Sequence, residues 1–212
     1  ADYNSAEMAG WSPWLGSPDF ETTPYRDRAV ARIRDLVRND GWAAGAVQRL
    51  TDATVGAEFR LSARPDYRAL ALAYGSKFDS VWAKEYADAR EASWRAWANC
   101  PRRWSDTTRR LTVPQLIRLG FRHYLVEGEA LAVLPWRPDR VGYGRARYAT
   151  TVQLVDPDRL SNPQMRQDTL TMRGGVEIDA DGAPLAYHIR QAHQGDWWAA
   201  GQTVTWDRVP RD

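Results

Sequence analysis

Cysteine is nearly absent from this sequence, with only Cys100 among its 212 residues. A single cysteine excludes a framework of intrachain disulfides and any zinc site made from several cysteines. No apolar run approaches the roughly 20 residues that a membrane-spanning helix needs, and the N-terminus lacks the apolar stretch of a signal peptide. We therefore expect a protein of a reducing compartment that has no membrane partner.

The common motifs of catalysis and cofactor binding are missing as well. The sequence contains none of the patterns GxxxxGK[ST], GxGxxG, GxSxG or HExxH, which mark nucleotide sites, nucleophilic serines and catalytic zinc. The three histidines are not spaced like a pair of metal ligands on one helix face. We therefore predict that the protein is not an enzyme and that it binds no metal and no cofactor.

Positive and negative charges are almost equal in number, with 29 Lys and Arg against 27 Asp and Glu. The arginines are clustered, in residues 26–38 and again in residues 102–110. Asp27 and Asp35 interrupt the first cluster, so it is not a pure phosphate-binding stripe. The second cluster flanks a tryptophan, which makes it the more plausible of the two for contact with DNA or with another subunit, while a solvated face is the commoner explanation for either cluster. Its members are Arg102, Arg103, Trp104, Arg109 and Arg110.

Apolar residues recur at helical spacing through the first two thirds of the chain. Residues 1–23 are rich in Gly, Ser and Pro, and we expect an N-terminal arm in which Trp11 and Trp14 are candidate anchors. Thr23-Pro24 pairs a capping residue with a proline suited to the first helical position, so the first helix should begin there. The predicted helices cover residues 24–40, 42–54, 66–74, 76–98 and 112–127, with a short strand at residues 55–64.

Alternation of apolar and polar residues replaces the helical pattern after Trp136. Residues 148–160 are typical of a strand that ends in a proline-containing turn. Residues 174–190 form two alternating runs joined by Asp181-Gly182, a strong hairpin signal, and residues 201–209 are the last predicted strand. Helices followed by antiparallel strands predict an α+β fold.

Glu127 and Glu129 flank Gly128 in an apolar run, and they could be either a catalytic pair of carboxylates or two structural residues. On an extended chain the two side chains would share a face, as a glycosidase requires. On a helix, residues two apart point in nearly opposite directions. The helical pattern leading to Gly128 favours the second arrangement, with His123 as a partner one turn before Glu127. We therefore expect structural ion pairs, and a glycosidase-like enzyme stays as a weaker alternative.

Four blocks of the sequence, taken in order, form a recognisable set. The first block carries VGxxF after a helix, and the second has a Trp-bearing helix, a loop with an aspartate and a helix that runs into GEA. The third is an xDPxRL turn, and the fourth is a glycine-led hairpin that ends in a tyrosine. The residues that carry the pattern are Gly56, Phe59, Trp94, Trp97, Gly128, Glu129, Asp156, Pro157, Gly175, Gly182 and Tyr187. As a set, the four blocks resemble the lambda-type family of tailed-phage portal proteins.

The resemblance implies a subunit of a dodecameric ring at one vertex of a capsid, in the virion and, during assembly, in the host cytoplasm. Such a ring conducts double-stranded DNA during packaging and ejection. Its implied partners are other copies of the chain, the major capsid protein, the terminase large subunit, a head-tail connector protein and, without sequence specificity, double-stranded DNA. A stand-alone nucleic-acid-binding module that uses the Arg102–Arg110 region stays open as an alternative.

The resemblance also suggests a division of the chain. After the arm, residues 24–110 would form a helical wing-like region, and residues 111–147 a stem-like helix with its connection. Residues 148–212 would form a small antiparallel clip-like region. Because portal proteins of this family continue into further stem, tunnel and wing elements, we expect the chain to be truncated relative to the family.

Overall fold

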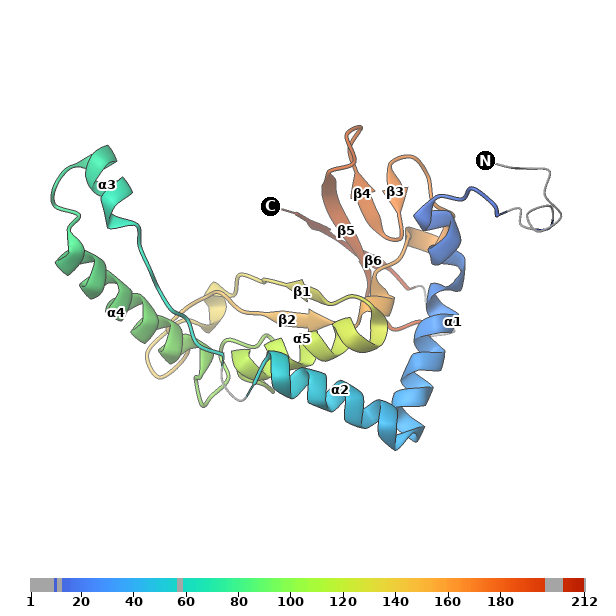
Figure 1. The fold of residues 1–212 in the computed structure, drawn as a ribbon, viewed down its shortest axis with the longest axis horizontal. Coiled ribbons are helices and arrows are strands. Elements are labelled where there is room, and N and C mark those ends of the chain that lie inside the picture. The colour runs from blue at the N-terminus through green and yellow to red at the C-terminus, as the bar shows by residue number, and fades with distance from the viewer. Residues whose placement is uncertain (1–9, 11–12, 57–58, 197–203, 212) are drawn as a thin grey trace. The chain divides into compact units, whose positions relative to one another are not determined.

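The structure is a computed structural model that describes residue 10 and residues 13–56, 59–196 and 204–211 (Figure 1). Contacts divide the chain into two compact units. The first unit joins Ala1–Ile33 to Asp158–Asp212, and the second unit is Arg34–Pro157. In the described residues, five α-helices and two antiparallel sheets make an α+β fold, which confirms the predicted fold class.

The predicted start of the first helix at Thr23-Pro24 is wrong. Helix α1 spans Pro18–Asn39, and Pro24 lies inside it. Ser17-Pro18 offers the same combination of a capping residue and a first-turn proline, and the Ser17 Oγ accepts a hydrogen bond from the Phe20 amide at 3.2 Å. Part of the expected N-terminal arm is therefore helical. Of its two candidate anchors, Trp14 is exposed and Trp11 lies outside the described residues.

Aspartate caps begin the next three helices, α2 (Gly41–Thr54), α3 (Tyr67–Tyr74) and α4 (Ser80–Ala98). In each case the carboxylate accepts a hydrogen bond from the amide three residues later, and the caps are Asp40, Asp66 and Asp79. The last of these caps sets the start of α4, which was predicted at Ser76. The strand predicted at residues 55–64 is also wrong, because the described residues 59–64 form no strand.

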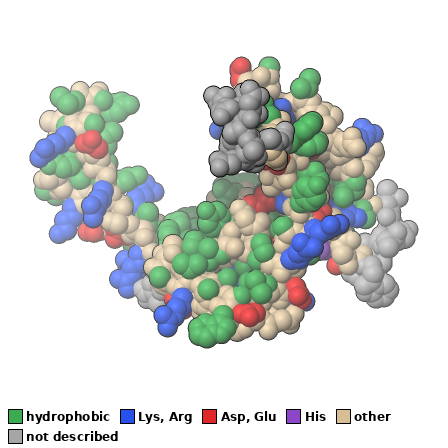
Figure 2. Space-filling view, turned by 45° about the vertical axis from the view of Figure 1, so that its right-hand side comes forward, with side chains coloured by type: hydrophobic (Ala, Val, Ile, Leu, Met, Phe, Trp, Pro, Cys, Tyr) green, Lys and Arg blue, Asp and Glu red, His purple; other side chains and the backbone are tan. Residues whose placement is uncertain are grey.

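Aromatic rings follow one another along α3 and α4. Tyr74 contacts Phe78, Phe78 contacts Trp82, and Trp82 stacks on Tyr86 with ring centroids 5.1 Å apart. Figure 2 shows hydrophobic and basic side chains interspersed on this segment, at the left of the view. Much of its apolar surface is exposed, including Leu72 and Val81. The apolar residues that predicted these helices by their spacing therefore serve partly to bring rings into contact along one helix face, and they are not all buried in a core.

Helix α5, Val113–Glu127, carries the core of the second unit. Val113, Leu116 and Val126 are buried on it, and α2 packs alongside. The helix starts as predicted, with the Gln115 side chain accepting a hydrogen bond from the Thr112 amide at 2.9 Å. It ends as predicted at Gly128, which has a left-handed φ of 84°. The chain then enters a two-stranded antiparallel sheet of β1 (Leu131–Val133) and β2 (Gln153–Val155).

The first unit holds a four-stranded antiparallel sheet in the order β3-β4-β5-β6. Its strands are β3 (Met172–Arg173), β4 (Val176–Ile178), β5 (Pro184–Arg190) and β6 (Trp206–Pro210). The predicted hairpin is confirmed between β4 and β5, with Gly182 at a φ of 85°. The N-terminal part of α1 is attached by the Arg26 guanidinium, which donates to the Leu160 carbonyl at 3.3 Å.

Short 3₁₀ turns complete the described elements: η1 (Pro138–Arg140), η2 (Pro157–Arg159) and η3 (Pro163–Met165). Each begins at a proline, whose fixed φ and missing amide suit the first position of a helical turn. Among the described helices, none combines the length and the apolar character that a membrane span requires.

Candidate functional site

The arginines of residues 102–110 lie on a loop that is folded around one buried carboxylate. We call residues 100–112 the first arginine loop. Asp106 is 1% exposed, and its two oxygens accept four hydrogen bonds from later residues of the same loop. The Thr108 amide and hydroxyl donate at 2.8 Å each, the Arg110 amide at 2.8 Å and the Leu111 amide at 2.9 Å. One side chain therefore fixes the path of the loop as far as the start of α5.

These contacts also keep Asp106 charged. Burial acts to raise the pKa of its carboxyl, but the hydrogen bonds from the Leu111, Arg110 and Thr108 amides act more strongly, and the pKa is lowered from its ordinary value. Because the carboxylate is surrounded by its own loop, its negative charge faces backbone amides and not the arginine side chains. The sequence analysis did not single out Asp106 by number, although an aspartate in this loop belongs to the pattern that it matched.

The four arginines of the first arginine loop are all exposed. Arg103 and Arg109 have left-handed backbone conformations, with φ of 55° and 58°, which non-glycine residues adopt only at some cost. The Arg109 guanidinium lies 3.8 Å from the centroid of the Trp104 ring, a cation–π contact. The structure thus brings together all five residues that the sequence proposed as an interface.

A second loop, which the sequence analysis missed, lies against the first. We call residues 136–148 the second arginine loop. Arg140 donates to the Thr107 carbonyl at 2.9 Å and to the Asp106 carbonyl at 3.4 Å. In the other direction, Arg102 donates to the Gly144 carbonyl. The signal was visible in the sequence, because four arginines occur between Trp136 and Tyr148; the proximity of the two loops was not.

The two arginine loops concentrate positive charge. They hold eight of the chain's 29 basic residues and two of its 27 acidic residues, so they carry +6 in a chain whose net charge is +2. The two acids are already engaged: Asp106 is buried, and Asp139 pairs with Arg137 at 3.1 Å. Among the described residues, no carboxylate pairs with the exposed side chains of Arg103, Arg110, Arg145 or Arg147.

The aromatic residues that carry the sequence resemblance contact one another in the second unit. Phe59 contacts Trp94, and Trp94 contacts Trp97, with ring centroids 6.4 Å and 5.2 Å apart. The Trp97 Nε1 donates to the Thr150 carbonyl at 3.0 Å. Gly56, at a φ of 68°, ends the α2 region, and its carbonyl accepts a hydrogen bond from Arg118 at 3.4 Å. These residues connect α2, α4 and α5, which is a structural role.

Glu127 belongs to a charge network and not to a carboxylate pair. Its side chain is 8% exposed and accepts from the Arg34 guanidinium at 2.8 Å and from the His123 Nδ1 at 2.8 Å. Arg34 also reaches Asp156, at 2.9 Å. The helix ends at Glu127, so Glu129 lies beyond Gly128 and outside the helix. The network therefore fastens α1, α5 and the turn after β2 to one another within the second unit.

The residues of the first unit that carry the sequence resemblance lie in turns and in a strand, where they have structural roles. Gly175, at a φ of 86°, lies so close to residue 161 that a Cβ on it would be 2.5 Å from the Ser161 amide nitrogen. Gly182 occupies the hairpin turn, where the Asp179 carboxylate accepts from two amides, and Tyr187 lies in the middle of β5. Pro157, the last residue of the second unit, is fully buried.

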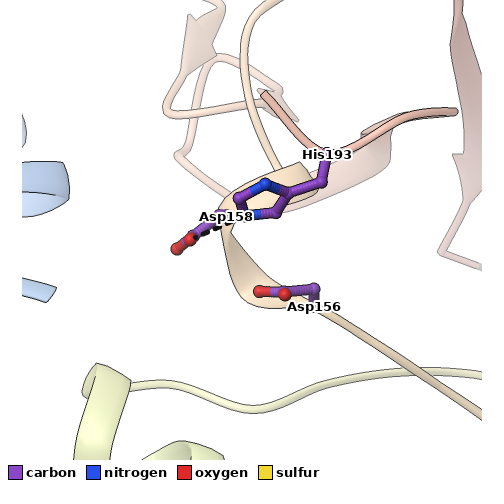
Figure 3. Close-up of side chains that lie close together, drawn as sticks. All are labelled: Asp156, Asp158 and His193. Carbon is purple, nitrogen blue, oxygen red and sulfur yellow. Dashed lines mark hydrogen bonds and ion pairs between the residues drawn. The ribbon is translucent and has the colours of Figure 1, made fainter. Parts of the chain in front are cut away.

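One imidazole of the first unit lies beside a carboxylate. The His193 Nε2 is 3.2 Å from an oxygen of Asp158, which is 8% exposed on its side chain (Figure 3). This contact holds the segment after β5 against the turn η2. Asp156, the other residue drawn in Figure 3, belongs to the second unit and to the Arg34 network described above.

Comparison with known proteins finds one family over nearly the whole chain. The model of a family described as "Phage portal protein, lambda family" matches residues 4–212. The portal protein of Escherichia phage N15 is 34% identical over 206 residues, which are 97% of this chain and 36% of that protein. Portal protein B of Escherichia phage lambda is 32% identical over the same fractions. The chain thus spans about a third of the length of these relatives, 36% in both cases.

Proposed function

We propose a function on one premise: the chain belongs to the lambda family of phage portal proteins. The resemblance that its sequence suggested is thereby confirmed. On this premise, the chain is part of a portal subunit that assembles into a dodecameric ring at one vertex of the capsid. The ring conducts double-stranded DNA during packaging and ejection, and it offers docking sites to the terminase and to head-tail connector proteins.

The observation that carries the proposal is the extent of the family match, which spans residues 4–212. The nearly balanced charge of the whole chain is compatible with a conduit, because a continuous basic stripe along a channel would resist the sliding of DNA, whereas a local basic patch makes only a few contacts with it. Since the chain covers 36% of its relatives' length, the remaining parts of a complete portal subunit would come from sequence outside it.

The proposal includes the partners and the location that the family implies. They are other copies of the chain, the major capsid protein, the terminase large subunit, a connector protein and DNA, in the virion and, during assembly, in the host cytoplasm. The wing-like, stem-like and clip-like regions at residues 24–110, 111–147 and 148–212 stay predictions, because they concern places in an assembled ring.

We also propose that the chain is not an enzyme. The residue most suited to acid-base work, Glu127, has its carboxylate engaged by Arg34 and His123. The glycosidase alternative predicts that Glu127→Gln abolishes hydrolysis of a glycoside substrate and leaves the fold intact. The structural role predicts a lower unfolding midpoint and no change in any activity, because a neutral amide pairs more weakly with the Arg34 cation.

The experiment that tests the portal function is direct imaging of the oligomer. The chain extended by the remainder of its gene product should form rings with twelve-fold symmetry in negative-stain class averages, with a matching mass by light scattering. A strictly monomeric full-length protein that shows no ring would overturn the proposal.

A second candidate function, a stand-alone nucleic-acid-binding module, is favoured by the charge of the two arginine loops. It differs from the portal function in one measurable respect. Such a module binds nucleic acid as a monomer and forms no ring at any concentration, whereas a portal subunit binds DNA weakly and assembles.

A further inference from the structure

We propose that the two arginine loops form one preorganised surface that binds the phosphate backbone of double-stranded DNA. This inference rests on the proposed function, in which DNA passes the subunit, and it goes further by naming the residues that meet the DNA. The surface consists of residues 100–112 and 136–148 of the second unit, with the exposed arginines of both loops as its phosphate ligands.

The two arginine loops form a single surface. Arg102 of the first loop donates to the Gly144 carbonyl of the second, and Arg140 of the second donates to the Asp106 and Thr107 carbonyls of the first. A further link runs through the strand after the second loop, where the Val152 amide donates to the Ser105 carbonyl at 2.7 Å. Contacts in both directions hold the loops together before any ligand arrives.

In the described part of the chain, the exposed guanidinium groups of the two loops are not neutralised by carboxylates. Six arginines of the two loops are exposed, and no carboxylate among the described residues pairs with them. They are Arg102, Arg103, Arg109, Arg110, Arg145 and Arg147. By contrast, the exposed arginines of α1 alternate with Asp27 and Asp35, which lowers their attraction for a polyanion. The acid that could have neutralised the first loop, Asp106, is turned inward and held by amides.

Contacts within the first arginine loop hold the surface rigid. Asp106 fixes residues 107–111, and the Trp104 ring supports Arg109. Ordering flexible side chains and loops on binding costs free energy, so a loop that is ordered beforehand binds more tightly for the same contacts. Two arginines are also held in left-handed backbone conformations, and such conformations persist only where the surrounding structure enforces them.

The charge of the surface favours DNA over an acidic protein surface as its partner. Outside the two loops this chain has 21 basic and 25 acidic residues, from the totals of 29 and 27 less eight and two. A second copy therefore offers only a small excess of acid, spread over a mixed surface. Double-stranded DNA presents one negative charge every ~1.7 Å of its axis, and Arg is the side chain best suited to phosphate. The density of free arginines matches DNA better.

The backbone structure of the loops further favours phosphate contacts over base reading. Neither loop contains Asn or Gln, the side chains that recognise adenine in the major groove, although Arg can pair with guanine there. No described helix or strand longer than the three-residue turn η1 lies within either loop, so no element is available to enter a groove. Binding should therefore be independent of DNA sequence and sensitive to salt.

The test uses this chain, a fluorescein-labelled 30-base-pair duplex and fluorescence anisotropy from 50 to 200 mM NaCl. Three double variants are compared, and each removes two exposed charges. Arg103→Gln with Arg110→Gln alters the first arginine loop, and Arg145→Gln with Arg147→Gln alters the second. Arg28→Gln with Arg32→Gln on α1 is the matched control. Circular dichroism before each titration shows whether a variant is folded, and the two loop variants test the surface independently.

We expect each loop variant to weaken duplex binding about tenfold, and to reduce the slope of log K against log salt by about two, because one counterion is released for each phosphate contact. The control should change affinity less than about twofold. Equal losses in the control and the loop variants would overturn the inference, since any lost charge would then have the same effect. A wild-type affinity that does not depend on salt would overturn it as well.

A second probe separates duplex from single-stranded DNA. Tyr143 lies fully exposed between two glycines of the second arginine loop, and an exposed ring of this kind can stack on unpaired bases. A 30-nucleotide single strand should bind no more tightly than the duplex, and Tyr143→Ala should leave duplex affinity unchanged. Tighter binding of the single strand that Tyr143→Ala abolishes would overturn the assignment to duplex DNA.

Ring formation is measured separately, with the same substitutions made in the chain extended by the remainder of its gene product. If the loop variants form normal rings but lose DNA affinity, both proposals hold. If rings form and the loop variants bind DNA like the wild type, the portal function stands and the arginine surface is wrong. If no ring forms while the loop variants lose affinity, the surface stands and the portal function fails.

Discussion

Two loops of this chain each fold around one buried polar side chain, Asp106 in the first arginine loop and Asn162 in the segment before β3. Both side chains are more than nine-tenths buried, and both loops hold non-glycine residues at positive φ. Asp106 only accepts, and its four donors are later groups of its own loop. Asn162 both donates and accepts, and it joins three places in the first unit.

The contacts of Asn162 require a neutral amide. Its Nδ2 donates to the Arg166 carbonyl at 2.9 Å and to the Asp168 carboxylate at 2.8 Å, and its Oδ1 accepts from the Gly175 amide at 2.7 Å. A carboxylate at this position could not donate and would face the Asp168 charge. A carboxylate at position 106 meets only donors. The two loops differ because one closes on amides, while the other closes on a carbonyl and a carboxylate.

The consequence concerns the surface that each loop presents. In the first arginine loop the buried charge is negative and internal, and the exposed charges are all positive. In the Asn162 loop the central amide is neutral, and the exposed charges are mixed, since Arg166 and Asp168 are both exposed. Of these two loops, only the first carries a net positive charge toward an outside partner, which is why it, and not the Asn162 loop, is part of the proposed DNA contact.

The largest expected effect breaks the Asn162 loop at its tightest point. Gly175→Ala places a Cβ 2.5 Å from the Ser161 nitrogen at a φ of 86°, so the backbone must move and the hydrogen bond to Asn162 must stretch. We expect a loss of about 3–5 kcal/mol from the first unit. The measurement is hydrogen exchange of the β5 amides, which should lose protection while the α5 amides keep theirs.

Gly174→Ala is the matched control, because its φ is also positive, at 53°, while nothing lies within 4 Å of a Cβ there. Its cost should be about 1 kcal/mol, from the backbone conformation alone. Equal costs for the two glycines would mean that the close approach to Ser161 is unimportant.

The next substitution exchanges the chemistry of one loop for that of the other. Asn162→Asp replaces two hydrogen-bond donations by repulsion from the Arg166 carbonyl and the Asp168 carboxylate. We expect the free energy of unfolding to fall by about 3 kcal/mol at neutral pH. Because a protonated carboxyl can donate again, part of that loss should return in urea titrations near pH 4. A variant as stable as the wild type at pH 7 would remove the distinction between the loops.

The reciprocal exchange, Asp106→Asn, should cost less, about 2 kcal/mol. One amide oxygen can still accept from the Thr108 hydroxyl and the Arg110 and Leu111 amides, but the new NH₂ then faces the Thr108 amide, another donor. Urea unfolding followed by circular dichroism measures the difference. Asp106→Ala, which loses all four contacts, should cost more and provides the comparison.

The pH dependence of this difference has a definite sign. The folded pKa of Asp106 is lowered, so its contribution to stability is fully present above the unfolded value of about 4 and is lost as pH falls through the folded pKa. The gap between the wild type and Asp106→Asn should therefore narrow as the pH is lowered below about 4. A gap that widens on acidification would contradict the hydrogen-bond geometry.

Local signals in the sequence predicted the parts of the fold that depend on neighbours in the chain. Thr112 and Gly128 mark the two ends of α5, and Asp181-Gly182 marks the hairpin, because caps and tight turns are decided within a few residues. The start of α1 was missed, since Ser17-Pro18 and Thr23-Pro24 carry the same signal and the sequence does not rank them.

The candidate site was predicted only in part, for a similar reason. The arginines of the first loop are consecutive pairs that any inspection finds, and the role of Glu127 follows from its spacing to His123. The second arginine loop joins the site through Arg140 and Gly144, more than 30 residues away from their partners Thr107 and Arg102. Contacts at that separation depend on the complete fold of the second unit, and no local pattern reports them.

The smallest expected effect tests whether the backbone of the first arginine loop is strained. Arg103 has a φ of 55°, and the described residues give its exposed side chain no ion pair. Arg103→Gly removes the cost of a left-handed conformation, about 1–2 kcal/mol, and adds entropy to the unfolded chain worth about 0.5–1 kcal/mol. The net result should be unchanged stability or a gain of up to about 1.5 kcal/mol by urea unfolding.

Arg110→Gly is the control, because Arg110 is exposed, has no positive φ and would keep the hydrogen bond from its amide to Asp106. This change should only destabilise the protein. If Arg103→Gly destabilised the protein as much as Arg110→Gly, the left-handed conformation at residue 103 would carry no strain, and Asp106 would be holding a loop that was already relaxed.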